Sequence, residues 1–73
     1  MTLNQLRPGQ CAVVRMMHNS GPIRRRLRDL GLIEGTAVTC LGRSPLGDPA
    51  AYGVRGAAIA LRQADSRTIE VEA

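Results

Sequence analysis

Residues 23–49 read IRRRLRDLGLIEGTAVTCLGRSPLGDP and pass from a helix to a corner, a strand and a rigid loop. Ile23, Leu27 and Leu30 follow the i, i+4, i+7 spacing of one helical face, and arginines cover much of the remaining surface of this segment. Gly31 stands where a left-handed residue commonly ends a helix. We therefore predict a short amphipathic helix that has Pro22 at its first position and stops at this glycine.

We predict β-strands in five short segments, because apolar residues alternate or cluster in each of them. Glycine, proline and polar residues separate these segments and predict the turns between them. The helix is inserted between the first and second strands, and the polar residues 63–67 predict a turn. Strands this short curl most easily into a small barrel, so we expect a mainly β fold, a small β-barrel with one inserted short α-helix. The predicted strands are 10–17, 36–43, 50–55, 57–61 and 68–72.

Alternation along the strands predicts which side chains share a face of the sheet. Tyr52 is aligned with Val54, and Ile69 and Val71 are expected to point inward. Both faces of residues 10–17 are largely apolar, and parity leaves open which of them is inside.

The N-terminal residues predict one helical turn that covers an end of the core. Leu3 and Leu6 lie three residues apart and follow a threonine that can cap a helix. Pro8 and Gly9 then predict a turn. We expect both leucines to plug the barrel, because they would otherwise be exposed to water.

The length of 73 residues predicts a single domain, residues 1–73, with a small core. A chain of this size buries only about 60–65% of the surface that its unfolded form exposes. Hydrophobic residues make up 44% of the chain, yet it has no Phe, no Trp and one Tyr, so the core must be largely aliphatic.

The net charge is +4, and all ten basic residues are arginines interspersed with six acids. This charge produces only a moderate positive electrostatic potential, and Tyr52 is the only aromatic side chain on which bases could stack. We therefore expect no nucleic-acid partner. The N-terminus lacks a signal-peptide pattern, and no stretch approaches the roughly 18–20 apolar residues of a membrane span. Together with two cysteines that are expected to be reduced, these features predict a cytoplasmic protein.

No catalytic constellation is recognisable, so we expect no enzyme activity. Cys11, His18 and Cys40 are the candidate metal ligands, since thiolate and imidazole suit zinc or ferrous iron. They lack the C-x-x-C or H-x-x-x-H spacing of a strong site, and free cysteines commonly behave as small buried hydrophobes. We expect no required cofactor, and weak or adventitious Fe(II) or Zn is the most that these residues predict.

The predicted fold does not by itself explain two features of the predicted surface. They are the arginine face of the helix and the tip of the loop of residues 44–49, whose two prolines make it stiffer than a strand connection needs to be. Solvated arginines and an ordinary turn are the simpler interpretation. The candidate partner-binding residues are Arg24, Arg25, Arg26, Arg28, Leu46, Gly47 and Asp48.

The run RRRLRDLGLIEGT at 24–36, followed by SPLGDP at 44–49, AIALR at 58–62 and IEVE at 69–72, resembles the FeoA family of bacterial ferrous iron uptake. The opening LNQLRPG is also similar to the start of that family. The resemblance implies an SH3-like β-barrel with an inserted helical segment. It covers essentially the whole chain in the expected order.

The resemblance also implies a role beside FeoB, a membrane permease with a cytosolic GTP-binding domain. The chain would be an accessory or regulatory protein that docks on the cytosolic part of this transporter and is peripheral to the membrane through its partner. The alternative is a transition-metal-binding or metal-sensing module of the kind found in metal-dependent repressors. Whether the chain forms a homo-oligomer is left open by the sequence.

Overall fold

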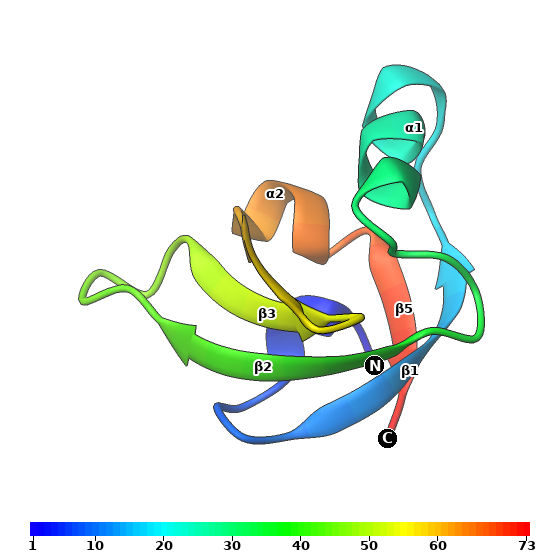
Figure 1. The fold of residues 1–73 in the computed structure, drawn as a ribbon. Helices are drawn as coiled ribbons and strands as arrows, with labels where there is room; N and C mark the ends of the chain where they lie inside the picture. The colour runs from blue at the N-terminus through cyan, green and yellow to red at the C-terminus, as the bar shows by residue number, and fades with distance from the viewer.

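One antiparallel sheet of five strands, in the order β4-β3-β2-β1-β5, forms the body of the molecule, and the computed structural model describes residues 1–73. The sheet bends strongly around its concave side, as Figure 1 shows. The predicted mainly β fold is confirmed. The strands are β1 (Cys11–Met17), β2 (Ala37–Arg43), β3 (Ala50–Val54), β4 (Ala57–Leu61) and β5 (Ile69–Glu72).

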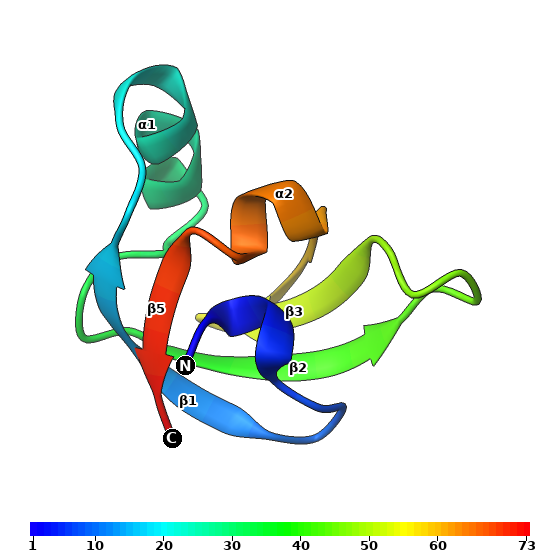
Figure 2. The same cartoon turned by 180° about the vertical axis from the view of Figure 1, so that it is seen from behind.

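Three short helical elements accompany the sheet. A 3-10 helix, η1 (Leu3–Gln5), precedes β1, α1 (Gly21–Asp29) lies between β1 and β2, and α2 (Gln63–Ser66) lies between β4 and β5. Figure 2 shows η1 and α2 on the concave side of the sheet, whereas α1 stands out at one end. The longest helix has nine residues, and no helix has the length and apolar character needed to cross a membrane.

The core contains fifteen buried hydrophobic residues, and one of them, the fully buried Tyr52, supplies its only aromatic ring. Val54, Ile69 and Val71 are also buried, which confirms the inward faces predicted for their strands. Leu3 and Leu6 are fully buried beneath the sheet, so the prediction that the N-terminal turn plugs the core is confirmed.

The inner face of β1, which parity left open, is the one that carries Ala12 and Val14. A register shift between Val14 and Met16 then turns the strand, so that Met17 is buried and Met16 is 52% exposed. A β-bulge of this kind moves later side chains to the other face and cannot be read from alternation.

The helix stop at Gly31 has the predicted form. Gly31 has a φ of +101°, Leu32 N–H donates to the Leu27 carbonyl at 3.0 Å, and Gly31 N–H donates to the Arg28 carbonyl at 2.9 Å. This pair of bonds is a Schellman ending, which satisfies two carbonyls of the last helical turn. It also places Leu32 in the core.

Two expectations about these segments are wrong. Ile23 and Leu30 are 46% and 39% exposed, and only Leu27 of the apolar helical face is buried. The reason is that α1 stands at the end of a small sheet, so only the middle of its apolar face meets the core. Residues 63–67 form a helical turn instead of a plain polar turn, because Gln63 N–H at its start is bound by the Asp48 carboxylate at 2.9 Å.

We expect Gly31→Ala to lower the free energy of unfolding by about 1–3 kcal/mol. A side chain is disfavoured at this positive φ, and an added Cβ would lie 3.1 Å from Val54 Cγ1. Urea unfolding followed by circular dichroism measures the loss. Gly42→Ala is the matched control, since its added Cβ would meet nothing within 4 Å and its φ is not positive. Equal losses in the two variants would contradict this role of Gly31.

Candidate functional site

The arginines of α1 are not equally available to a partner. Arg24 is half-buried, and its guanidinium donates to the Met17 carbonyl at 3.1 Å and to Asn19 Oδ1 at 3.4 Å. This side chain therefore holds the start of α1 against the end of β1. Its position is explained by the fold.

Two further arginines of α1 form ion pairs at the surface. Arg26 Nη2 lies 2.5 Å from Asp65 Oδ2, and Arg28 Nη2 lies 3.1 Å from Glu34 Oε1. Exposed pairs of this kind contribute at most about 1 kcal/mol and exchange partners readily. Arg25 has no ion pair and no side-chain hydrogen bond, so it is the arginine of this helix with the greatest freedom to bind an acidic group.

The loop between β2 and β3 presents one large apolar side chain to water. Leu46 is 95% exposed at the tip. Gly47 takes a φ of +87° and donates its N–H to the Ser44 carbonyl at 2.8 Å, and Ser44 N–H donates to the Pro49 carbonyl at 3.0 Å. These bonds fix the loop, so the leucine is displayed on a rigid turn.

Asp48 has a partner within the chain. Its carboxylate accepts the Gln63 N–H at the start of α2, as described above. The acidic group at the loop is therefore used within the fold, and it joins two segments that are 15 residues apart. Among the candidate loop residues, the side chain of Leu46 is the one without an intramolecular explanation.

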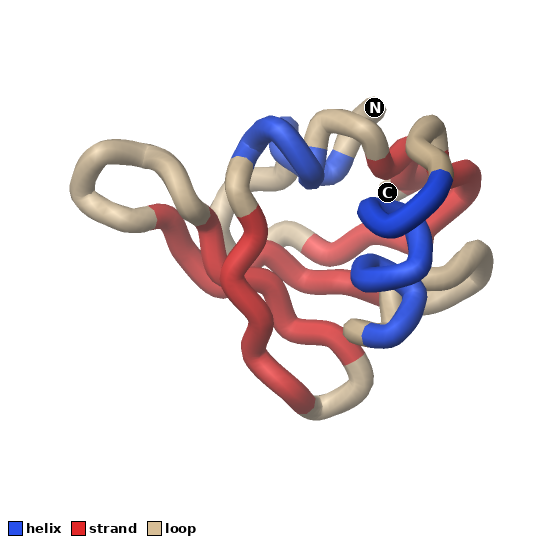
Figure 3. The backbone as a smooth tube through the Cα atoms, turned by 90° about the horizontal axis from the view of Figure 1, so that it is seen from above, coloured by secondary structure: helices blue, strands red, loops and turns tan.

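The arginine helix and the loop lie at opposite ends of the molecule. Figure 1 shows α1 and the β2–β3 loop on opposite sides, and the view from above in Figure 3 agrees. The seven residues of β2 carry the chain from one end to the other, a path of roughly 23 Å for an extended strand. The two candidate surfaces are not one patch.

The three candidate metal ligands are not brought together. Cys11 is exposed and Cys40 is fully buried. Cys11 is paired with Thr39, so the next residue along β2 points to the opposite face of the sheet. The two thiols therefore lie on opposite sides of the sheet and cannot hold one ion.

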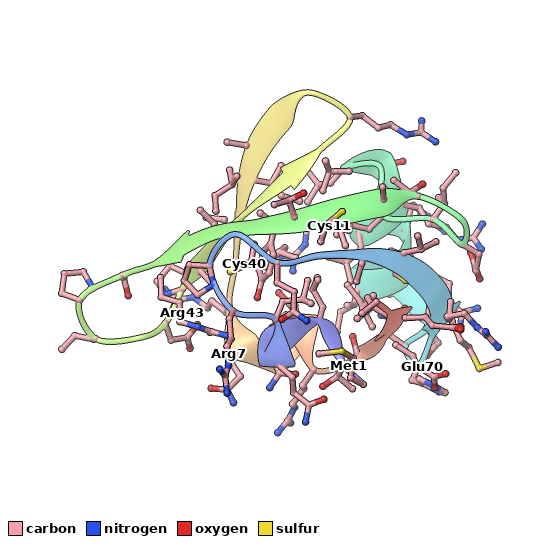
Figure 4. All side chains as sticks on the ribbon, turned by 90° about the horizontal axis from the view of Figure 1, so that it is seen from below. Met1, Arg7, Cys11, Cys40, Arg43 and Glu70 are labelled. Carbon is pink, nitrogen blue, oxygen red and sulfur yellow. The ribbon has the colours of Figure 1, made fainter.

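His18 lies beyond the other end of β1, where its Nε2 is 2.9 Å from Glu70 Oε1. Figure 4 shows Glu70 well away from both cysteines. No group of three or more His, Cys, Asp or Glu side chains is arranged to hold a metal ion. The donor set proposed from sequence thus does not fit a zinc or ferrous centre.

Two pKa values differ from their ordinary range, and both have structural causes. The hydrogen bond from His18 lowers the pKa of Glu70, and the positive charges of His18, the N-terminus and Arg15 add to this effect. Burial raises the pKa of Tyr52, whose hydroxyl faces Ser66 in the core. Neither group lines one of the surface pockets of the molecule.

We expect His18→Gln to return the pKa of Glu70 toward the ordinary range, as measured by NMR titration of its carboxyl carbon. A depressed acid pKa stabilises the fold above the unfolded pKa of about 4.3, and this contribution is lost as the pH falls through the lower, folded value. Acid unfolding of the variant should therefore be less steep in this window. Arg28→Gln is the control, since it disturbs an ion pair with Glu34 elsewhere, and it should leave the titration of Glu70 unchanged.

Comparison with known proteins identifies the family. The model of the FeoA domain matches residues 1–73. A Fe(2+) transport protein A/Fe(2+) transporter FeoB fusion protein of Porphyromonas gingivalis (strain ATCC BAA-308 / W83) is 33% identical over 72 residues. The match covers 99% of this chain, which spans only 8% of the length of that relative.

Two solved structures show the same fold. The iron(II) transport protein A of Clostridium thermocellum is 32% identical with a TM-score of 0.96, over 99% of this chain and 44% of that one. The FeoA of Stenotrophomonas maltophilia, described as a prokaryotic SH3 domain protein complexed with zinc, is 32% identical with a TM-score of 0.87, over 99% of this chain and 89% of that one. The SH3-like fold predicted from sequence is confirmed, and the chain belongs to the FeoA family of ferrous iron transport.

Proposed function

We propose that this protein is a non-enzymatic accessory protein that docks on the cytosolic region of a FeoB-type transporter and modulates ferrous iron uptake. The observation that carries the proposal is the match over all 73 residues to a domain that, in the Porphyromonas gingivalis relative, is fused to FeoB. A fusion keeps two parts at a high effective concentration, which favours a direct contact between them. The same role would place the protein in the cytoplasm, at the membrane only through its partner.

The side chains of the molecule support a binding role over a catalytic one. His18 is engaged with Glu70 at the surface, and Tyr52 is buried among aliphatic residues. Neither side chain lines a surface pocket in which a substrate could meet a general acid or base. What the surface offers instead is Leu46 at a rigid tip and Arg25 on the outer face of α1.

The loop is the better candidate for the main contact. A fully exposed leucine on a turn that is already fixed loses little conformational entropy on binding, and burying it would contribute about 1.5–3 kcal/mol. An exposed arginine contributes less, since its charge is screened by salt. Because the two surfaces face opposite ways, α1 would touch a second part of the transporter or an acidic segment that wraps around the barrel.

The metal-sensing alternative has less support. It requires a donor set within one coordination sphere, and Cys11, His18 and Cys40 lie apart on different faces. A zinc ion accompanies the Stenotrophomonas maltophilia relative. The cysteine and histidine residues of the present chain do not form a group of three donors.

We expect Leu46→Ser to weaken binding to the cytosolic region of the cognate FeoB-type transporter by about tenfold or more, as measured by calorimetry. Its stability should change by less than about 0.5 kcal/mol, because the side chain is exposed. Met16→Ser is the matched control, since it removes another exposed apolar side chain, on β1. Unchanged affinity in Leu46→Ser would rule out the loop as the docking site.

A substitution of Asp48 is expected to change the stability of the fold, so its effect on stability must be measured along with its effect on binding. Asp48→Ala removes the bond to Gln63 N–H, so it should destabilise the fold by about 0.5–2 kcal/mol, as expected for a lost helix cap. Urea unfolding measures this loss. A loss of binding in this variant without any loss of stability would instead assign the carboxylate to the partner contact.

A further inference from the structure

The two edge strands of the sheet differ in whether another segment of the chain covers them. The β5 edge is covered by the N-terminal segment, since Thr2 pairs with Glu70 and Val71 N–H donates to the Met1 carbonyl at 2.8 Å. The β4 edge has no comparable cover. Four of its five residues are exposed or half-buried, and none of them makes a backbone hydrogen bond outside the regular ladder.

The register of the β3–β4 hairpin identifies the free backbone groups. Val54 pairs with Ala57 across a two-residue turn in which both φ values are positive, and such a closing pair is hydrogen-bonded. Alternate residues of β4 therefore bond to β3. The N–H and C=O groups of Ala58 and Ala60 point away from the sheet, toward solvent.

The β4 strand lacks the usual protection of an edge. Natural proteins block free edges with charged side chains, proline or a bulge. The sequence of β4 is AAIAL, with none of these, and its pairing with β3 is regular over all five residues. The exposed side chains beside the free backbone groups are the methyl groups of Ala58 and Ala60, which leave the edge accessible to another strand.

A shallow hollow lies beside the same edge on the outer face of the sheet. Its apolar floor includes Leu41, Ala51 and Ala60, and the base of the β2–β3 loop contributes Ser44 and Pro49. A side chain from a strand added to β4 would find apolar contact there.

Charged side chains at both ends of β4 indicate which kind of partner segment would fit beside it. Arg55 precedes β4 in the turn and Arg62 follows it, and both are exposed with no ion pair. A second copy of this chain, paired antiparallel through β4, would bring these like charges near one another. A segment with acidic residues at its ends would meet them favourably.

We infer that the β4 edge is a strand-addition site for an extended partner segment that has small or apolar side chains at its centre and acidic residues at its ends. Backbone hydrogen bonds to Ala58 and Ala60 would provide the pairing, and the hollow near Ser44 would accept one side chain. The inference does not depend on the proposed role beside FeoB. It can be tested with a peptide in the absence of any transporter.

The probe is a synthetic peptide of six alternating valine and threonine residues flanked by two glutamates at each end, titrated into the ¹⁵N-labelled protein. We expect the amides of Ala58 and Ala60 to shift and to become protected from hydrogen exchange. Ala58→Pro removes one outward donor but no bond to β3, so it should weaken binding at least tenfold. The same peptide with N-methylated edge-facing amides should fail to bind, and this control needs no protein variant.

Arg55→Gln combined with Arg62→Gln should weaken binding by about 3- to 10-fold and reduce its salt dependence. Arg7→Gln is the charge control, because Figure 4 places Arg7 on the N-terminal side, away from the β3–β4 hairpin. The inference is overturned if the peptide does not bind or if its N-methylated form binds equally well. It is also overturned if the free protein is a dimer that Ala58→Pro converts to a monomer.

Discussion

The pairing of the N-terminal segment with β5 is the contact on which the rest of the barrel depends. Val71 N–H donates to the Met1 carbonyl, and Arg43 Nη2 donates to the carbonyls of Asn4 and Leu6 at 2.7 and 2.8 Å. These bonds hold Leu3 and Leu6 in the core, where both are fully buried. A chain of 73 residues has a small hydrophobic core. If the N-terminal segment left the end of the barrel, a large share of the core's apolar surface would therefore be exposed to water.

The same contact makes the molecule asymmetric. Because residues 1–6 cover the β5 side, the free edge of the sheet is confined to β4, which follows the hairpin turn that contains Arg55. The helix α1 lies at the end of the molecule opposite the β2–β3 loop, and its helix stop at Gly31 returns the chain to β2. Surface features that could bind a partner are thus distributed around the molecule, and α1 lies far from the β2–β3 loop.

Much of the fold could be predicted because its corners depend on local stereochemistry. Gly31 has the positive φ that its place after the helix indicated, and the alternating residues of β3 and β5 face the core as expected. The bulge in β1 and the exposure of Ile23 could not be predicted, since both depend on how a small sheet ends. The role of Asp48 in the loop could not be predicted either. Its hydrogen bond with Gln63 is a tertiary contact, and no local sequence pattern indicates it.

The internal contacts separate residues that the fold requires from those that it leaves unexplained. Arg24 and Asp48 are polar candidates whose groups are used within the chain, whereas Leu46 and the backbone of β4 have no such use. These two features are also connected, since the hollow beside Ala60 is lined by residues at the base of the β2–β3 loop. A strand that added to β4 would therefore extend along the side of the barrel that carries the exposed leucine. One partner segment could engage both, which gives the rigid loop a reason to be placed next to an unprotected edge.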